Sequence, residues 1–430
     1  SETSARAYAL GRCVCVPPEV FARKYWATGP LHSAAGSLPR DFADLFSPAA
    51  ADELLTDRAL RTPFIRMAKE GQVLPGDCFT GSGGFGAAVA DQVDPAMVLR
   101  EFAAGATIVL QGLHRTWPAL QTFTRQLVAE LGHPAQVNAY ITPEANRGFD
   151  PHYDVHDVFV LQVSGEKHWR IHAPVRTYPR ADEPWSQYRA AVNARAREEP
   201  VLDVVMRPGD ALYLPRGWLH SAVARAGTSI HLTIGVAGFT GADVVRELAA
   251  AVAGADDLRT PLPIMGSAAM TASATSATSA ADRDEAADRD EVTAAVAEIS
   301  RALIAALGTT PAARPDRIAA ALDHKLRQLV RPEPVAPLAT VTAAAELSAA
   351  VAVRLRHGLD VQVTVDQTRV HLKMPGQGLG LPAQCETAIR ALARGERHRA
   401  GALPGLDEAD SLVVSRRLLR SGILVTDGLA

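Results

Sequence analysis

The chain has 430 residues, of which 47% are apolar and 21% charged, and 44 Lys and Arg stand against 47 Asp and Glu. This composition is typical of a globular protein with two or three domains. A net charge of −3 gives no overall attraction for nucleic acid or an anionic membrane, and no apolar run approaches the roughly 20 residues of a membrane span.

The N-terminal segment gives little evidence of targeting or metal binding. Residues 1–21 have no basic start and no sustained apolar run, so no signal peptide is expected. Four cysteines form neither a disulfide framework nor a zinc ribbon. The pair Cys13-x-Cys15 could bind a metal, but two small residues on a short strand is the better interpretation. We expect a protein of the reducing cytoplasm.

The first 131 residues predict short helices with one strand between them. Ser47 is a good N-cap and Pro48 a good first helical residue. The expected helices cover residues 47–60, 94–104 and 117–131, and the strand covers 107–110. The Gly-rich segment 79–86 lacks the Lys-Ser/Thr of a phosphate loop and follows no clear strand, so a mobile loop near a cleft is the better interpretation.

Residues 136–236 read mostly as β-structure. Short apolar runs alternate with turn residues, which is typical of a jelly-roll sandwich or barrel. The expected strands cover 136–142, 158–163, 167–171, 201–206, 211–214, 218–224 and 229–236. Turns are expected at 164–165, 207–210 and 215–217, and a helical or loop insert at 185–197.

The composition changes after residue 240. Helices are expected at 241–252, 292–307 and 315–330, and the Ala/Ser/Thr-rich and then charged insert 266–291 is expected to be a flexible loop or linker. The Pro-rich segment 331–337 predicts a stiff linker and a domain boundary.

The last 95 residues, 336–430, predict a small α/β domain. Residues 347–356 read either as the end of a helix or as a strand. The other expected elements are a hairpin of 360–365 and 369–373, helices over 385–394 and 408–421, and a strand over 423–425. Eleven Lys and Arg against nine Asp and Glu give this domain +2, which is too weak to predict nucleic-acid binding.

A metal site is expected around His152-x-Asp154. On a strand, side chains two residues apart lie on the same face, so the imidazole and the carboxylate would project into one cavity. His220, after two turns and a strand, is the best candidate for a third ligand from another strand. Two His and one carboxylate suit Fe(II), because they leave three coordination positions for a bidentate co-substrate and O₂.

The remaining histidines of this region are weaker candidates. His156 would share the face of His152 and Asp154, but three side chains along one strand spread over about 13 Å and cannot easily surround one ion. We expect His168, His172 and His231 to be hydrogen-bonded residues of the barrel or its rim.

Lys167 is the candidate for binding a co-substrate. A 2-oxo acid with a second carboxylate needs a cation inside the barrel, and a barrel-facing Lys without a partner invites an anionic ligand. The alternative is a solvent-facing Lys in a hairpin. Asn138 and Tyr140, alternate residues on the preceding strand, could add hydrogen bonds to the same ligand.

Four segments together resemble the JmjC-type, cupin-like oxygenases, and within them the ribosomal oxygenase group of protein hydroxylases. They are Asn138-Ala-Tyr140, DPHYDVHDVFVLQVSGEKHWRIH (150–172), PGDALYLPRGWLH (208–220) and SIHLTIGV (229–236). An early pattern is also similar to that group; it consists of Phe21, Tyr25, Trp26, Pro30 and Leu31.

The resemblance implies an α+β protein of three parts: a double-stranded β-helix (jelly-roll/cupin) catalytic domain over 1–240, a helical dimerisation region over 241–335, and a winged-helix-like domain over 336–430. It implies that His152, Asp154 and His220 bind Fe(II). It further implies that Lys167 binds the far carboxylate of 2-oxoglutarate, with Asn138, Tyr140 and Thr233 lining the pocket. Gly235 departs from the family, whose members often carry a small hydroxyl residue there.

The expected function is that of a 2-oxoglutarate-dependent Fe(II) dioxygenase, which consumes O₂ and releases succinate and CO₂. By resemblance, the substrate is Arg or His of a ribosomal protein and the enzyme is a homodimer. The same chemistry on a peptide natural product or small molecule is the main alternative. A nucleic-acid-binding regulator and a histone demethylase are the others. The Gly-rich loop 79–86 and the insert 176–199 are expected to frame the substrate groove.

Overall fold

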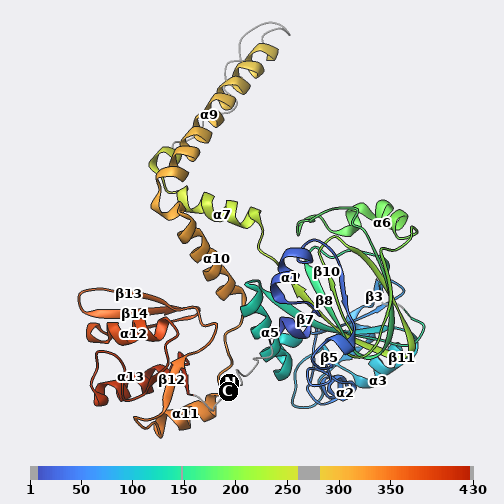
Figure 1. Cartoon of the computed structure of the whole chain (residues 1–430), viewed down its shortest axis with the longest axis horizontal. Coiled ribbons are helices and arrows are strands. Elements are labelled where there is room, and N and C mark those ends of the chain that lie inside the picture. Colours follow the sequence, from blue (N-terminus) through green and yellow to red (C-terminus); the bar gives the residue numbers. More distant parts are fainter. Residues whose placement is uncertain (1–7, 147–148, 260–280, 427–430) are drawn as a thin grey trace. The chain divides into compact units, whose positions relative to one another are not determined.

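The protein contains two compact units, residues 1–238 and 239–430, called here the N-terminal and C-terminal units (Figure 1). The computed structural model describes residues 8–146, 149–259 and 281–426. None of the helices among these residues is long and apolar enough to cross a membrane.

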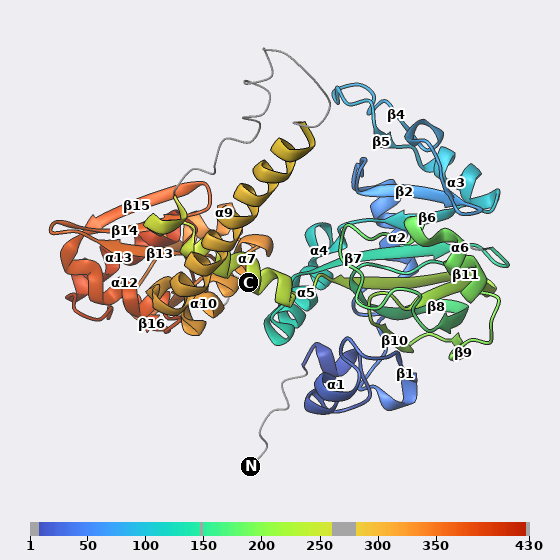
Figure 2. The ribbon, with the colours of Figure 1, turned by 90° about the horizontal axis from the view of Figure 1, so that it is seen from above.

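The N-terminal unit is built on antiparallel strands, in agreement with the sequence. Its strands are β1 Leu31–Ser33, β2 Ile65–Lys69, β3 Gln72–Val73, β4 Thr80–Gly81, β5 Gln92–Val93, β6 Thr107–Leu110, β7 Ala135–Thr142, β8 Asp157–His172, β9 Leu202–Met206, β10 Ala211–Leu214 and β11 Leu219–Val236. Nine of them form one sheet in the order β1-β10-β8-β11-β7-β6-β2-β3, with β9 on β8. The central strands lie side by side in both views (Figures 1 and 2).

The helices of the same unit are α1 Pro18–Lys24, α2 Pro48–Thr56, α3 Pro95–Ala103, α4 Leu113–Thr116, α5 Pro118–Leu131 and α6 Arg189–Arg195. Two of them, α2 and α3, begin at residues where the sequence predicted a helix start. The Ser47 side chain accepts a hydrogen bond from Ala50 N, and Asp94 caps α3 in the same way. Helix α2 ends at Thr56, four residues earlier than expected. The insert 185–197 is helical, with a 3-10 turn at Trp185–Tyr188 before α6.

Strands β8 and β11 are each continuous, so the expected turn at 164–165 is wrong. Gly165 has φ +63° and lies within β8, opposite a register shift between Arg225 and Ile230 of β11. An added Cβ at Gly165 would lie 2.3 Å from Thr228 O. The glycine therefore permits a β-bulge, and the bulge bends two long strands where the sequence suggested four short ones.

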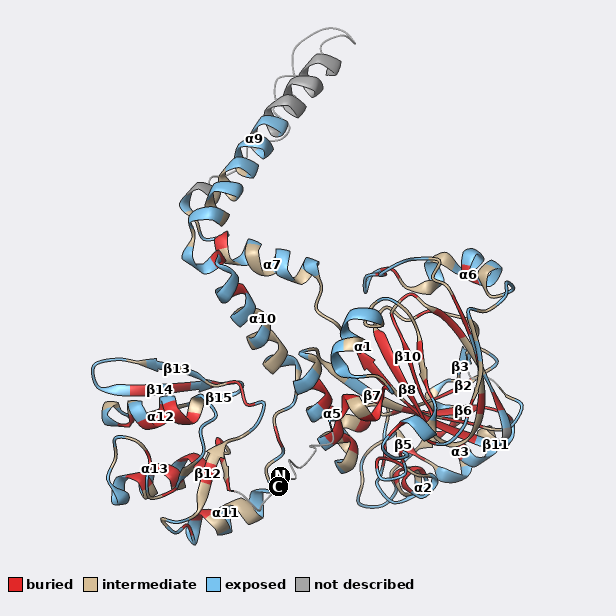
Figure 3. Ribbon diagram, in the orientation of Figure 1, coloured by how far each residue is buried: buried red, intermediate tan, exposed pale blue. Residues whose placement is uncertain are grey.

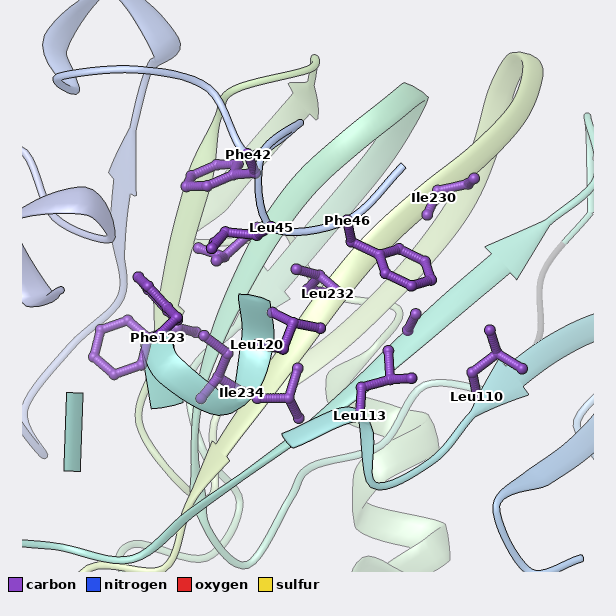
Figure 4. Close-up of a cluster of buried hydrophobic side chains, with 14 of the residues drawn as sticks. Phe42, Leu45, Phe46, Leu110, Leu113, Leu120, Phe123, Ile230, Leu232 and Ile234 are labelled. Atoms are coloured by element: carbon purple, nitrogen blue, oxygen red, sulfur yellow. The ribbon is translucent and has the colours of Figure 1, made fainter. Parts of the chain in front are cut away.

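The core lies on both faces of β8. Phe159 and Leu161 belong to the larger apolar cluster, whereas Val158 and Val160 belong to a second cluster with Trp169. Buried residues follow these central strands (Figure 3). Figure 4 shows the larger cluster, in which residues of α5 face residues of β11. Its labelled members are Phe42, Leu45, Phe46, Leu110, Leu113, Leu120, Phe123, Ile230, Leu232 and Ile234.

The C-terminal unit contains helices followed by a small α/β region. Its helices are α7 Gly241–Val252, α9 Ala281–Thr309, α10 Pro315–Leu329, α11 Pro337–Ala345, α12 Glu386–Ala393 and α13 Glu408–Arg420. Its strands are β12 Ala352–Leu355, β13 Gln362–Val365, β14 Arg369–Met374, β15 Gln377–Pro382, β16 His398–Arg399 and β17 Leu424–Thr426. They form two three-stranded sheets, β16-β12-β17 and β13-β14-β15.

Several expectations for this unit are corrected. Residues 282–291 are helical within α9 rather than a linker, because their Ala, Arg and Glu favour helix and no Gly or Pro interrupts them. The part of the insert over 266–280 lies outside the described residues. The ambiguous segment 347–356 contains strand β12, and the sequence did not predict α11 or β15.

Candidate active site

The His-x-Asp pair lies in the loop that leads into β8, not on a strand as expected. Atoms of His152, Asp154 and His220 that could each bind a metal all lie within 4.8 Å of one another. His220 Nε2 is 3.7 Å from Asp154 Oδ2. Among the described residues, no other group of His, Cys, Asp and Glu has this geometry.

Backbone hydrogen bonds hold the three residues together. His152 N donates to His220 O (3.1 Å) and His220 N donates to His152 O (2.8 Å), forming an isolated β-bridge. Gly217 N donates to Asp154 O at 2.9 Å. Between the pair, Tyr153 is fully buried with Val192 of the insert, and its hydroxyl donates to Glu183 O. The loop is thus anchored on both sides without a regular strand.

The tautomers of both histidines leave Nε2 available for a metal. His152 Nδ1 lies 2.7 Å from Asp150 O, and His220 Nδ1 lies 3.1 Å from Trp218 O. A carbonyl oxygen only accepts, so each Nδ1 carries the proton and each Nε2 keeps its lone pair. Two neutral imidazoles and one carboxylate fit Fe(II).

The protonation states agree with this donor set. Burial, followed by the neighbouring His152, lowers the pKa of His220 to about 4. Burial acts to raise the pKa of Asp154, but His220 and His152 outweigh it and hold this pKa below its usual value. At neutral pH the site therefore presents an ionised carboxylate and a neutral His220 imidazole.

Lys167 lies in the same pocket as the triad, and its side chain is buried (4% exposed). Burial lowers its pKa from 10.5 to about 7. Its Nζ is 3.2 Å from Thr142 Oγ1, and among the described residues no carboxylate pairs with it. The alternative of a solvent-facing hairpin Lys is wrong. Lys167 is a buried amine without a charged partner, and an anionic ligand would favour its protonated form.

The structure brings together two of the other three expected co-substrate residues. Tyr140 and Thr233 line the pocket with Lys167 and the triad. Asn138 is not among the lining residues; its Oδ1 accepts a hydrogen bond from Gly112 N at 3.0 Å. Burial, with a smaller contribution from Asp154, raises the pKa of Tyr140, so its hydroxyl remains a donor at neutral pH.

His156 lies outside the metal cluster, as expected, and packs on Gly235. An added Cβ at Gly235 would lie 2.5 Å from His156 Nε2. The imidazole therefore fills the space of the side chain that Gly235 lacks. At the other proposed metal position, Cys13 is buried, Cys15 is exposed, and no metal-binding group forms around them in the described chain.

Two of the other three histidines have partners and one does not. His168 lies 2.5 Å from Asp203, and His172 Nε2 lies 3.1 Å from Glu198 O. His231 is 3% exposed, lines the pocket, and its Nδ1 has no hydrogen-bond partner in the described chain. The expectation of a hydrogen-bonded His231 is wrong. Its spacing of two from Thr233 was the signal that both face the pocket.

Sequence reasoning also missed residues that other elements bring to the site. Thr107 of β6 and Phe149 line the pocket. The rings of Phe149 and Trp185 lie 6.1 and 6.2 Å from that of His152. Phe149 and Trp185 come from segments without regular strands, so no periodic pattern pointed to them.

Known proteins match this part of the chain. Residues 114–244 match the JmjC domain family. The chain is 32% identical over 244 residues to ribosomal oxygenase 1 of Gallus gallus, covering 54% of this chain and 37% of that protein. It is 42% identical over 98 residues to the bifunctional lysine-specific demethylase and histidyl-hydroxylase NO66 of Drosophila persimilis, covering 23% and 13%. The match to these relatives thus spans little more than a third of their length at most.

A structure of YcfD, a ribosomal oxygenase from Escherichia coli, aligns over 97% of this chain and 99% of its own, with a TM-score of 0.49 and 16% identity.

Proposed function

We propose, from the premise that residues 114–244 form a JmjC domain, that this protein is an Fe(II)- and 2-oxoglutarate-dependent dioxygenase that hydroxylates a side chain of a ribosomal protein. The observation that carries the proposal is the combination in one pocket of two histidines with free Nε2 atoms, Asp154, and the buried cation Lys167. Relatives described as ribosomal oxygenase and histidyl-hydroxylase support the choice of substrate.

Each side chain has a defined task in this proposal. His152, Asp154 and His220 would hold Fe(II), and Lys167 would pair with the far carboxylate of 2-oxoglutarate. The Tyr140 and Thr233 hydroxyls would donate to the same ligand. When bound, Fe(II) and 2-oxoglutarate supply the activation of O₂ that hydroxylation needs.

The pocket walls restrict water around the reacting groups. Val158, Val160 and Leu214 are each at most 3% exposed and line the pocket beside Trp169. An apolar wall strengthens the pairing of Lys167 with a carboxylate, because the local dielectric is low.

The charges near the metal site favour histidine over arginine as the target. Arg66 lies over the ring of Phe149 (5.3 Å) and Arg189 over the ring of Trp185 (4.6 Å). Among the described residues that line the pocket, the one carboxylate is the metal ligand Asp154. An incoming guanidinium would meet the charges of Arg66 and Arg189, and the described pocket lining offers it no carboxylate apart from Asp154, whereas a neutral imidazole avoids this repulsion.

The remaining parts of the proposal concern assembly and location. Apolar side chains on α7, α9 and α10 are exposed, among them Val245 (63%), Ile304 (70%) and Leu329 (58%), which supports a homodimer through these helices. The three helices and two small sheets of residues 336–430 support a winged-helix-like domain. Four free cysteines support a reducing cytoplasm. Light scattering on the purified protein tests the dimer; a monomer would contradict it.

The catalytic proposal is tested in two stages. Purified protein should bind Fe(II) and 2-oxoglutarate without O₂ and then convert 2-oxoglutarate to succinate in air. His220→Ala should abolish both the binding stage and the conversion to succinate. His168→Ala removes a rim imidazole paired with Asp203 and should abolish neither stage. Failure of the wild type to bind Fe(II) or consume 2-oxoglutarate would refute the proposal.

Mass spectrometry of ribosomal proteins identifies the substrate. A deletion strain should lose a mass of about 16 Da, one oxygen atom, from a histidine of one ribosomal protein. Unchanged masses would favour a peptide natural product or a small molecule as substrate, and a modified arginine would contradict the charge argument.

A further inference from the structure

His231 is held in one orientation inside the pocket. Its ring stacks on Tyr140, with centroids 5.1 Å apart and planes 4° apart. Trp169 meets it edge-on at 5.4 Å and 82°. On β11, Leu232 and Ile234 face the apolar core (Figure 4), so the alternate residues His231 and Thr233 face the pocket. The imidazole is thus placed by its strand and clamped by two aromatic rings.

His231 Nδ1 is left without a partner. This nitrogen has no hydrogen bond in the described chain, although the residue is only 3% exposed. Trp169 Nε1, on the same pocket wall, is also buried without a partner. A buried donor without an acceptor costs about 1–3 kcal/mol. The buried histidines His172 and His220, in contrast, each contact a carbonyl.

The part of the pocket around His231 has more hydrogen-bond donors than hydrogen-bond acceptors. Lys167 lies near enough for its charge, after burial, to lower the pKa of His231 well below its usual value. The hydrogen bond of Lys167 is to Thr142, whose Oγ1 is also 3.2 Å from Thr107 Oγ1. His231 is therefore neutral at physiological pH and carries one N–H donor.

Trp169 lies near both the candidate metal triad and Lys167. Its ring centroid is 6.0 Å from that of His220 and 6.0 Å from Lys167 Nζ. A ligand that reaches from the triad to Lys167 would carry its anionic group at the end away from the metal. A carboxylate, with about four lone-pair sites, fits the donors gathered there.

We propose that His231 donates a hydrogen bond, as a neutral imidazole, to the same far carboxylate that Lys167 pairs with, and so makes the pocket selective for 2-oxo acids with a second carboxylate. This rests on the proposed function, because 2-oxoglutarate is the ligand invoked. His231 acts here on the co-substrate and not on the metal.

The test compares two co-substrates in the presence of Mn(II), which replaces Fe(II) without oxidising in air. One is 2-oxoglutarate; the other is 2-oxobutyrate, which has the same 2-oxo acid group and lacks the far carboxylate. Calorimetry gives Kd for each with wild type, His231→Phe and His231→Asn. Phe keeps the ring that stacks on Tyr140 and removes both nitrogens, whereas Asn keeps a donor near the position of Nδ1.

A hydrogen bond to a charged group predicts that His231→Phe weakens 2-oxoglutarate binding roughly 10- to 100-fold. The Kd of 2-oxobutyrate should change less than about twofold, because that ligand has no group to lose. His231→Asn should restore part of the 2-oxoglutarate affinity. An equal loss for both ligands would show that His231 acts near the metal or supports Tyr140, and no loss for either would overturn the proposal as well.

A measurement on the wild type covers the case in which the Phe variant does not fold. In ¹⁵N-histidine spectra of the Zn(II)-loaded protein, which is diamagnetic, 2-oxoglutarate should protect one further imidazole N–H from solvent exchange and 2-oxobutyrate should not. Equal protection by both would overturn the proposal. If the wild type binds neither Mn(II) nor 2-oxoglutarate, the proposed function itself fails, and that result is distinct from a change confined to the His231 variants.

Discussion

Replacing Lys167 with Met should stabilise the protein while it destroys co-substrate binding. Burial lowers the pKa of Lys167 from 10.5 to about 7, a difference that corresponds to about 5 kcal/mol. The unfolded chain keeps this Lys charged up to about pH 10. Below pH 7 the buried ammonium therefore lowers the free energy of unfolding by at most about 5 kcal/mol. Met keeps the length and removes the charge. Since Thr142 loses its hydrogen bond to Lys167, we expect a net gain of about 1–4 kcal/mol in the free energy of unfolding.

The sign of the pH dependence makes this prediction specific. Between pH 7 and about pH 10 the folded Lys167 is neutral and the unfolded one is protonated, so unfolding takes up a proton and wild-type stability rises with pH. The advantage of Lys167→Met should therefore be largest below pH 7 and shrink toward pH 10. Urea unfolding followed by a probe of the N-terminal unit measures it, with Lys24→Met, an exposed Lys of α1, as the control.

Two outcomes would refute the reasoning about Lys167. One is a Met variant less stable than wild type at every pH, which would mean that Lys167 is not a buried, unpaired cation. The other is a gain that does not change with pH. In either case the cost of burying Lys167 would no longer explain why it should pair with the far carboxylate of 2-oxoglutarate. The variant should also bind 2-oxoglutarate at least about a hundredfold more weakly, which calorimetry measures independently.

Three further predictions concern Lys167, Gly165 and Gly235. The affinity for 2-oxoglutarate should fall by up to about tenfold per pH unit above pH 7, because free Lys167 then loses its proton; calorimetry in a pH series checks this. Gly165→Ala should cost about 2 kcal/mol or more of unfolding free energy, because φ is +63° and the Cβ meets Thr228 O. Gly235→Ser should destabilise by about 1–3 kcal/mol through its clash with His156, and adding His156→Ala should restore most of the loss; urea unfolding measures both.

The sequence predicted the helices and strands that are determined by residues close to each other in the chain. Ser47 before Pro48 and Asp94 before Pro95 each begin a helix, because the side-chain oxygen accepts a hydrogen bond from the first turn. The apolar run 107–110 is strand β6, buried throughout. In these places the residues that decide the structure lie within one turn or one strand of each other.

Predictions that depended on distant partners were less accurate. Ser164-Gly165 has the composition of a turn, but β11 pairs along both halves of β8 and makes it a bulge. His152 and Asp154 share a direction although they lie in a loop, because the bridge to His220 and the burial of Tyr153 fix them. Side-chain alternation along a strand therefore does not explain why His152 and Asp154 lie together; the bridge to His220 and the burial of Tyr153 do.

The residues expected to bind the co-substrate show the same limit at single positions. Asn138 alternates with Tyr140 on β7 and was expected beside it, yet its amide is used by Gly112 N. His231 was expected to be hydrogen-bonded, because buried histidines usually are, yet the described chain gives it no partner. Whether a side chain has a hydrogen-bond partner depends on residues from other strands. Which residues become these neighbours cannot be derived from one sequence.

The bulge connects the fold to the chemistry. Lys167 lies on β8 just after Gly165, whereas His220 and His231 lie on β11 on the two sides of the matching shift between Arg225 and Ile230. One pair of strands therefore carries the proposed metal ligand His220 and the proposed partners of the far carboxylate. The distance between these positions is set by how far the bulge displaces one strand along the other. A change at Gly165 that leaves the protein folded should consequently alter which length of dicarboxylate binds best, and a variant with an unchanged preference would show that the bulge has no part in selecting the co-substrate.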